Sequence, residues 1–190
     1  MKNSISPTLM DDPQLSYSGE IATPLVKVSL SLALVAVILH TVGMACPYWL
    51  VGAMYYPPYG LNRMNIGVFQ GCSDLTGCTS ARGDTNDWQK ASAALEVVAE
   101  LLCLCDIVTL FAAMFKVKSS HTWKYVKIAS SMLTLAAALS MVVPLALYGT
   151  NANKMYPGVI LNVGWAYVLV CVSAIMQSLS GVTLIIELLV

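Results

Sequence analysis

Four long apolar segments constrain this chain more than any other feature of its sequence. They lie at about residues 25–45, 91–115, 126–147 and 163–186. A helix of about 20 residues crosses the hydrocarbon core of a bilayer, and each segment reaches that length. Hydrophobic residues make up 57% of the chain and charged residues 11%, which is too apolar for an ordinary soluble domain. A helix satisfies its own backbone hydrogen bonds in lipid, so the sequence predicts four transmembrane helices.

The loops between these segments divide the rest of the chain. We expect a cytosolic tail at 1–24, followed by one four-helix domain at 25–190. Within that domain we expect extracellular loops at 46–90 and 148–162 and a cytosolic loop at 116–125. Lysines indicate the orientation, because cytosolic loops of membrane proteins carry an excess of them. They gather at the start of the first segment and around the 116–125 loop: Lys27, Lys116, Lys118, Lys124 and Lys127. We therefore predict a multi-pass plasma-membrane protein with both termini in the cytosol.

Charge and motifs exclude several classes of function. The formal net charge is zero, so no basic surface is expected to bind nucleic acid. The sequence holds no phosphate-binding glycine loop, no HExxH zinc motif and no serine-nucleophile motif. We therefore expect no enzymatic activity, no cofactor and no metal site.

Two cysteines lie close together in the stretch "GVFQGCSDLTGC", which belongs to the first predicted extracellular loop. Disulfides persist outside the cytosol, so Cys72 and Cys78 are best explained as a disulfide that closes a small loop. Gly71 and Gly77 precede them and supply backbone freedom. Free thiols and a metal site are the alternatives, and a metal site lacks a nearby histidine. The other cysteines are expected to be free, three of them inside helices: Cys46, Cys103, Cys105 and Cys171.

The first extracellular loop is rich in Tyr, Pro, Gly and Asn. Its short runs separated by turn residues predict a small antiparallel sheet. Tyrosine is favoured in protein interfaces, so the loop tyrosines are candidate contact residues. They are Tyr55, Tyr56, Tyr59 and the Tyr156-Pro157 pair.

A series of motif residues follows the same order along the chain. Trp49 lies just beyond the first apolar segment, and Gly67-Val68-Phe69 precedes Cys72 and Cys78. Lys90 opens the second segment, and Gly164-Trp165 opens the fourth. With these residues, the chain resembles the claudin and peripheral-myelin-protein-22 superfamily over about residues 25–186.

This resemblance implies an all-α membrane protein, a four-transmembrane-helix bundle with a small extracellular antiparallel sheet. It also implies that the Cys72–Cys78 disulfide ties two strands, while Trp49 and Phe69 pack the sheet onto the bundle. The alternative is an aromatic belt at the membrane surface with no contact to the sheet. Phe69 stands where the family pattern has Trp, and the two cysteines are closer together than in that pattern.

The second apolar segment contains three acids: Glu96, Glu100 and Asp106. Each charge near the bilayer centre costs about 2.5–3.5 kcal/mol on insertion scales. From the rise of a helix, His40 is expected between Glu96 and Glu100 in depth, and Asp106 at the depth of Gln177. These residues are either a functional polar seam or plain helix-to-helix hydrogen bonds made by protonated acids. A functional seam would be a proton or cation path, or a docking site for another membrane protein.

Two functions remain in view. The first is a claudin-like protein that acts in cell–cell adhesion or in a paracellular barrier. It would lie in the lipid bilayer and bind copies of itself in cis and in trans through its extracellular loops. The second is an auxiliary subunit that modulates an ion channel or receptor through its transmembrane helices. A third reading, a small transporter that uses Glu100 and Asp106, lacks the inverted repeats and broken helices of such proteins.

Overall fold

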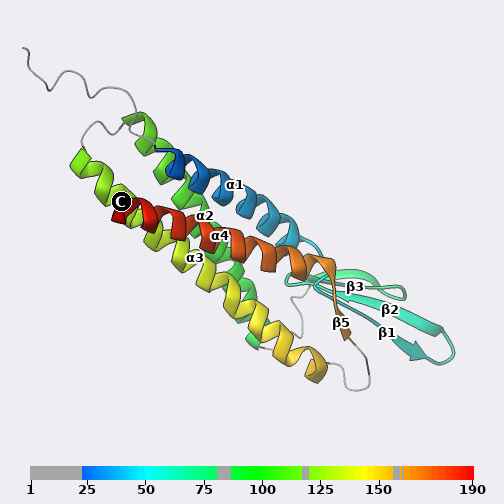
Figure 1. Cartoon of the computed structure of the whole chain (residues 1–190). Helices are drawn as coiled ribbons and strands as arrows, with labels where there is room; N and C mark the ends of the chain where they lie inside the picture. Colours follow the sequence, from blue (N-terminus) through cyan, green and yellow to red (C-terminus); the bar gives the residue numbers. More distant parts are fainter. Residues whose placement is uncertain (1–22, 81–86, 117–119, 156–158, 160) are drawn as a thin grey trace, which may run out of the picture.

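The computed structural model describes residues 23–80, 87–116, 120–155, 159 and 161–190. Four helices lie side by side as a bundle, and a small sheet extends from one end of it (Figure 1). The helices are α1 (Pro24–Ala45), α2 (Asp87–Lys116), α3 (Ser120–Met155) and α4 (Trp165–Leu189). α1 packs on α4 and α2, and α3 packs on α2 and α4.

Small and polar side chains face the inside of the bundle, while large apolar side chains face outward. α1 buries Ser29, Ala33 and Gly43 and exposes Ile38 and Val42. Small residues let helices approach closely in lipid. Two hydrogen bonds then fix the register of α1 against α4. The hydroxyls of Ser29 and Ser180 lie 2.8 Å apart, and the Ser173 hydroxyl donates to the Ala36 carbonyl over 2.8 Å.

Among the described residues, three helices are long and apolar enough to cross a membrane. They are α1, the Thr122–Asn151 part of α3, and α4. These helices confirm much of the predicted architecture. That α2 is a fourth span stays a prediction, because its apolar stretch carries Glu96, Glu100 and Asp106.

The sheet has five antiparallel strands in the order β4-β3-β2-β1-β5. The chain between α1 and α2 supplies β1 (Leu50–Tyr56), β2 (Gly60–Ile66), β3 (Gln70–Ser73) and β4 (Gly77–Ser80). β5 (Leu161–Val163) comes from the connection between α3 and α4 and pairs with β1, Leu50 opposite Val163. The two connections therefore meet in one sheet at one end of the bundle (Figure 1). The sequence predicted a sheet in the first connection only.

The helices extend beyond the apolar segments. α2 begins at Asp87, so Lys90 lies within its first turn rather than at its start. α3 runs to Met155, so the connection expected at 148–162 is partly helical and partly strand. Hydropathy marks the part of a helix that suits lipid, whereas helix ends depend on capping and packing. Most of the predicted N-terminal tail (1–22) and the Tyr156-Pro157 pair lie outside the described residues.

Candidate functional site

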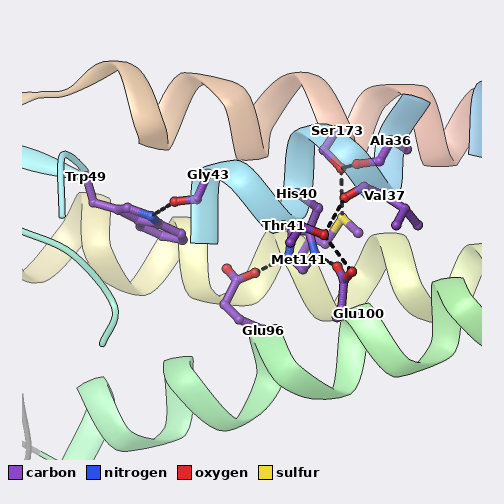
Figure 2. Close-up of polar contacts among 10 residues, drawn as sticks. All are labelled: Ala36, Val37, His40, Thr41, Gly43, Trp49, Glu96, Glu100, Met141 and Ser173. Atoms are coloured by element: carbon purple, nitrogen blue, oxygen red, sulfur yellow. Dashed lines mark hydrogen bonds and ion pairs between the residues drawn. The ribbon is translucent and has the colours of Figure 1, made fainter. Parts of the chain in front are cut away.

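Trp49 anchors the sheet to the bundle. It directly precedes β1, and its side chain is fully buried. Its indole Nε1–H donates to the Gly43 carbonyl at the end of α1 over 2.7 Å, as Figure 2 shows. Its ring packs against Tyr148 of α3 and Tyr167 of α4, with ring centroids 5.0 and 5.8 Å away. One side chain therefore contacts three helices at the base of the sheet.

Val68, rather than Phe69, completes this anchor. Val68 is buried in the same hydrophobic cluster as Trp49, and the Tyr148 hydroxyl donates to the Gly67 carbonyl over 3.3 Å. The Phe69 side chain is 38% exposed and lies outside that cluster. The expectation that Phe69 packs the sheet onto the bundle therefore needs correction, because the preceding residue, Val68, takes that buried position.

Two glycines of the motif allow backbones to touch. A Cβ atom at Gly67 would lie 2.7 Å from the Cys46 carbonyl oxygen, and one at Gly164 would overlap the Tyr48 carbonyl oxygen. The Gly164 amide donates to the Trp49 carbonyl over 2.8 Å. The next residue, Trp165, stacks on Tyr48 with ring centroids 5.7 Å apart. This segment therefore clamps the start of α4 to the base of β1.

Lys90 has a surface position near the start of α2. Its Nζ lies 3.9 Å from the Asp87 carboxylate, and both side chains are largely exposed. Such an exposed pair contributes little to stability. Lys90 therefore does not take part in the contacts that join the sheet to the bundle.

The predicted disulfide joins Cys72 and Cys78. These residues face each other across β3 and β4. The Ser73 hydroxyl accepts hydrogen bonds from the Leu75 and Thr76 amides over 3.2 and 3.3 Å, which closes the turn between the strands. The bond thus fixes the outer hairpin of the sheet. The remaining cysteines are free, as predicted: Cys46, Cys103, Cys105 and Cys171.

The β1–β2 hairpin exposes a cluster of large side chains. Tyr55 and Leu61 face each other in register, so they lie on the same face of the sheet. They are 69% and 61% exposed, and Tyr59 in the turn is 70% exposed. We call these three residues the hairpin patch. The side chain of Tyr56 lies outside the described residues.

A cluster of polar side chains lies between α1 and α2 inside the bundle. The His40 Nε2 is 2.5 Å from a Glu96 oxygen, and its Nδ1 is 2.6 Å from a Glu100 oxygen. The Thr41 hydroxyl donates to the other Glu100 oxygen over 2.7 Å. Figure 2 shows His40 and Thr41 on α1 facing the two glutamates on α2. The predicted position of His40 between the glutamates is therefore the one observed.

The hydrogen bonds set the smallest number of protons that this cluster holds. A carboxylate oxygen only accepts, so each contact between His40 and a glutamate needs a proton on the nitrogen or on the oxygen. At least two protons are thus shared among His40, Glu96 and Glu100, so the net charge of the cluster is no more negative than −1. His40 and Glu96 are fully buried, whereas the Glu100 side chain is 15% exposed. Thr41 is exposed as well, so the polar edge of the cluster reaches the outer surface of the bundle.

The other predicted seam residues lie apart from this cluster. Asp106 accepts a hydrogen bond from Ser130 of α3. Gln177 is fully buried, and its amide makes no hydrogen bond to the part of the chain that the structure describes. Asp106 and Gln177, which were expected at one depth, share no hydrogen bond among the described residues. The polar side chains thus form separate sites rather than one continuous seam.

The geometry of the cluster suits hydrogen bonding rather than metal binding. The two glutamates approach opposite nitrogens of the same imidazole, so the three side chains do not converge on one point. Within the described ranges, no group of three His, Cys, Asp or Glu side chains could hold a metal ion.

Sequence reasoning missed several residues of these sites. Tyr148 was assigned to a loop, although it is fully buried and its ring contacts both Trp49 and Trp88. Ser130 was not singled out as a partner for Asp106. An aromatic residue at the end of an apolar segment is the signal that could have pointed to Tyr148.

A family model described as the PMP-22/EMP/MP20/Claudin family matches residues 23–184, which is most of the chain. No curated protein matches the sequence.

Proposed function

Because this chain belongs to the PMP-22/EMP/MP20/Claudin family, and is thus a claudin-like multi-pass membrane protein, we propose that its sheet acts outside the cell in cell–cell contacts. In this proposal the protein lies in the plasma membrane, with both termini in the cytosol. The sheet binds sheets of other copies, in cis within one membrane and in trans between neighbouring cells. The role is structural rather than catalytic.

The connectivity supports a fourth span through α2. β1 and β5 pair, which brings the connection between α1 and α2 to the same end of the bundle as the connection between α3 and α4. If α1 and α3 both carry the chain toward the sheet, the chain must return between them, and α2 is the segment that returns. Glu96 and Asp106 of α2 are fully buried within the bundle, as acids in a membrane span must be.

Charge supports the orientation. Lys27, Lys124 and Lys127 lie near the helix ends remote from the sheet, and cytosolic sides are rich in lysine. The Cys72–Cys78 disulfide lies in the sheet, and disulfides persist outside the cytosol. Both observations favour an extracellular sheet.

The hairpin patch is the observation that carries the adhesion proposal. Tyr55, Tyr59 and Leu61 are among the most exposed large side chains of the sheet, and the sheet that bears them is fixed to the bundle through Trp49. An exposed apolar cluster on a rigid support is typical of a protein interface. The patch lies on the hairpin that extends away from the bundle (Figure 1).

Imaging of cell contacts tests this proposal. The tagged protein is expressed in cells that lack junctional strands, and its signal at contacts between expressing neighbours is compared with that on free membrane. We expect enrichment at contacts, and we expect the variant Tyr55→Ser with Leu61→Ser to lose it at unchanged surface expression. Leu75→Ser is the matched control, because Leu75 is an exposed leucine in the β3–β4 turn. Uniform wild-type signal, or equal loss in the control, would sink the adhesion proposal.

A second candidate function is favoured by the cluster between α1 and α2. Thr41 and Glu100 bring polar groups to the outer surface of the bundle, where a helix of a channel or receptor could hydrogen-bond to them in lipid. An auxiliary subunit of this kind would lose its partner in Glu100→Gln. Glu96→Gln is the control, because Glu96 belongs to the same cluster but is fully buried. Equal co-purification of the partner by both variants would contradict this role.

A further inference from the structure

A groove runs along the outside of the bundle between α1 and α4. It has a volume of about 320 Å³ and is mostly apolar. α1 supplies one wall and Met176 of α4 the other. The hydrogen bonds from Ser29 to Ser180 and from Ser173 to Ala36 hold these two helices in register on both sides of Met176. Its lining residues are Lys27, Val28, Ser31, Leu32, Val35 and Met176.

The groove follows the axis of α1, because most of its lining residues lie on one face of that helix. Lys27 and Val35 lie at its two ends, about 12 Å apart along the axis of α1. One leaflet of the hydrocarbon core is about 15 Å deep. Lys27 lies in the first turn of α1, so the groove extends from the membrane surface toward the bilayer centre. These dimensions suit one extended acyl chain.

The chemistry of the groove differs between its ends. Val28 and Val35 are nearly half exposed, and the Ser31 hydroxyl donates to the Lys27 carbonyl over 2.9 Å. The walls therefore offer little to a polar ligand. The ammonium group of Lys27 is exposed and forms no salt bridge with the described residues. Lys127, a lysine near the same end of the bundle, is by contrast paired with Glu187 over 3.5 Å.

We propose that this groove binds an anionic phospholipid, with an acyl chain along Val28, Leu32 and Val35 and the net-negative headgroup beside Lys27. α1 and α4 are both long and apolar enough to cross a membrane, so lipid surrounds the groove on its open side. A lysine near a membrane surface attracts anionic headgroups. The site does not depend on the adhesion proposal, since it lies on the opposite half of the molecule from the hairpin patch.

Native mass spectrometry of the full chain in detergent tests the headgroup contact. Phosphatidylserine and phosphatidylcholine of equal chain length are titrated against the wild type, Lys27→Gln and Lys124→Gln. Lys124 is the matched control, because it is an exposed lysine that does not line the groove. We expect the wild type to bind phosphatidylserine about five-fold more tightly than phosphatidylcholine, since one lysine contributes a factor of this size. Lys27→Gln should lose this preference and Lys124→Gln should keep it.

Filling the groove tests the acyl-chain contact. Val28→Trp places a large side chain in the groove, and Val42→Trp places one at an exposed position of the same helix that does not line it. We expect Val28→Trp to weaken binding of both lipids several-fold and Val42→Trp to leave it unchanged. Circular dichroism shows whether each variant keeps its helices. Equal preference for phosphatidylserine in Lys27→Gln and the wild type, or equal effects of the two tryptophans, would overturn the proposal.

Discussion

At the scale of single residues, Trp49 joins the base of the sheet to three helices. Its ring is fully buried among side chains of α3 and α4, and its indole donates to Gly43. Removing a buried tryptophan costs both the burial of its ring and the cavity that is left. The hydrogen bonds between strands hold the sheet together, but contacts such as those of Trp49 are needed to fix the sheet to the bundle.

We therefore predict that Trp49→Ala lowers the free energy of unfolding by about 3–5 kcal/mol. Trp49→Phe keeps much of the packing but loses the hydrogen bond to Gly43. The lost hydrogen bond should lower the free energy of unfolding by about 1 kcal/mol, in addition to the cost of the smaller ring. Thermal unfolding in detergent measures both. Trp165→Ala serves as control, because Trp165 is half exposed. A Trp49→Ala protein no less stable than Trp165→Ala would contradict the anchoring role.

Gly164 provides a second test at this scale. A Cβ atom there would overlap the Tyr48 carbonyl oxygen, so Gly164→Ala should force the start of α4 away from β1 and destabilise by about 1–3 kcal/mol. Gly71→Ala is the matched control, since a Cβ at Gly71 would meet only the Asn65 carbonyl oxygen at 3.9 Å. We expect the control to unfold close to the wild-type temperature. Equal shifts in both variants would show that the close approach is unimportant.

Depth along a helix could be derived from the sequence, whereas the direction of a side chain around the helix could not. His40 was expected between Glu96 and Glu100 because helical rise fixes depth, and it contacts both. Asp106 and Gln177 were expected at one depth, yet Asp106 bonds Ser130 instead. The faces that α2 and α4 present to each other depend on packing across the whole bundle, which no local pattern specifies.

At the scale of elements, the cluster of His40, Glu96 and Glu100 joins α1 to α2. We predict that His40→Leu destabilises by about 3–5 kcal/mol, because it leaves two carboxylates without the group that shared their protons. Replacing His40, Glu96 and Glu100 together by leucine should recover most of this stability, since an apolar set removes the buried charges. Thermal unfolding in detergent compares the two. A triple variant less stable than His40→Leu would contradict this account of the cluster.

The disulfide acts on one hairpin rather than on the whole fold. It closes a short loop, so the entropy that it removes from the unfolded chain amounts to about 2 kcal/mol. Replacing Cys72 and Cys78 by serine should make the exposed β3–β4 hairpin sensitive to protease and leave the helices intact. Limited proteolysis followed by mass spectrometry locates the cuts, and Cys46→Ser is the control because Cys46 is free. Unchanged cleavage in β3 and β4 would show that the strands do not need the bond.

The sequence predicts the helices better than it predicts the helix ends or the short strand β5. Long apolar segments identify the helices, because lipid demands apolar side chains over a fixed length. The ends of α2 and α3 extend into polar sequence, where hydropathy gives no signal. β5 contains only Leu161–Val163, which is too short for an alternating pattern. It forms because β1 offers its free edge beside the start of α4.

At the scale of the whole molecule, the sheet that bears the hairpin patch is joined to the bundle from both of its connections. The connection between α3 and α4 enters the sheet through β5, and Trp49 enters the bundle. The sheet is thus attached to the bundle through both β5 and Trp49. This attachment supports our proposal that Tyr55, Tyr59 and Leu61 bind other copies, because repeated contacts between identical copies require a fixed orientation of the surface that makes them.

Mixing three cell populations tests most directly the claim that copies of the protein bind each other between cells. One population expresses the protein with one fluorescent tag, a second expresses it with another tag, and a third expresses none. The account predicts enrichment of both tags where the first two populations touch, and none where either touches the third. Equal signal at all contacts, or enrichment against cells that lack the protein, would contradict binding between copies through the sheet.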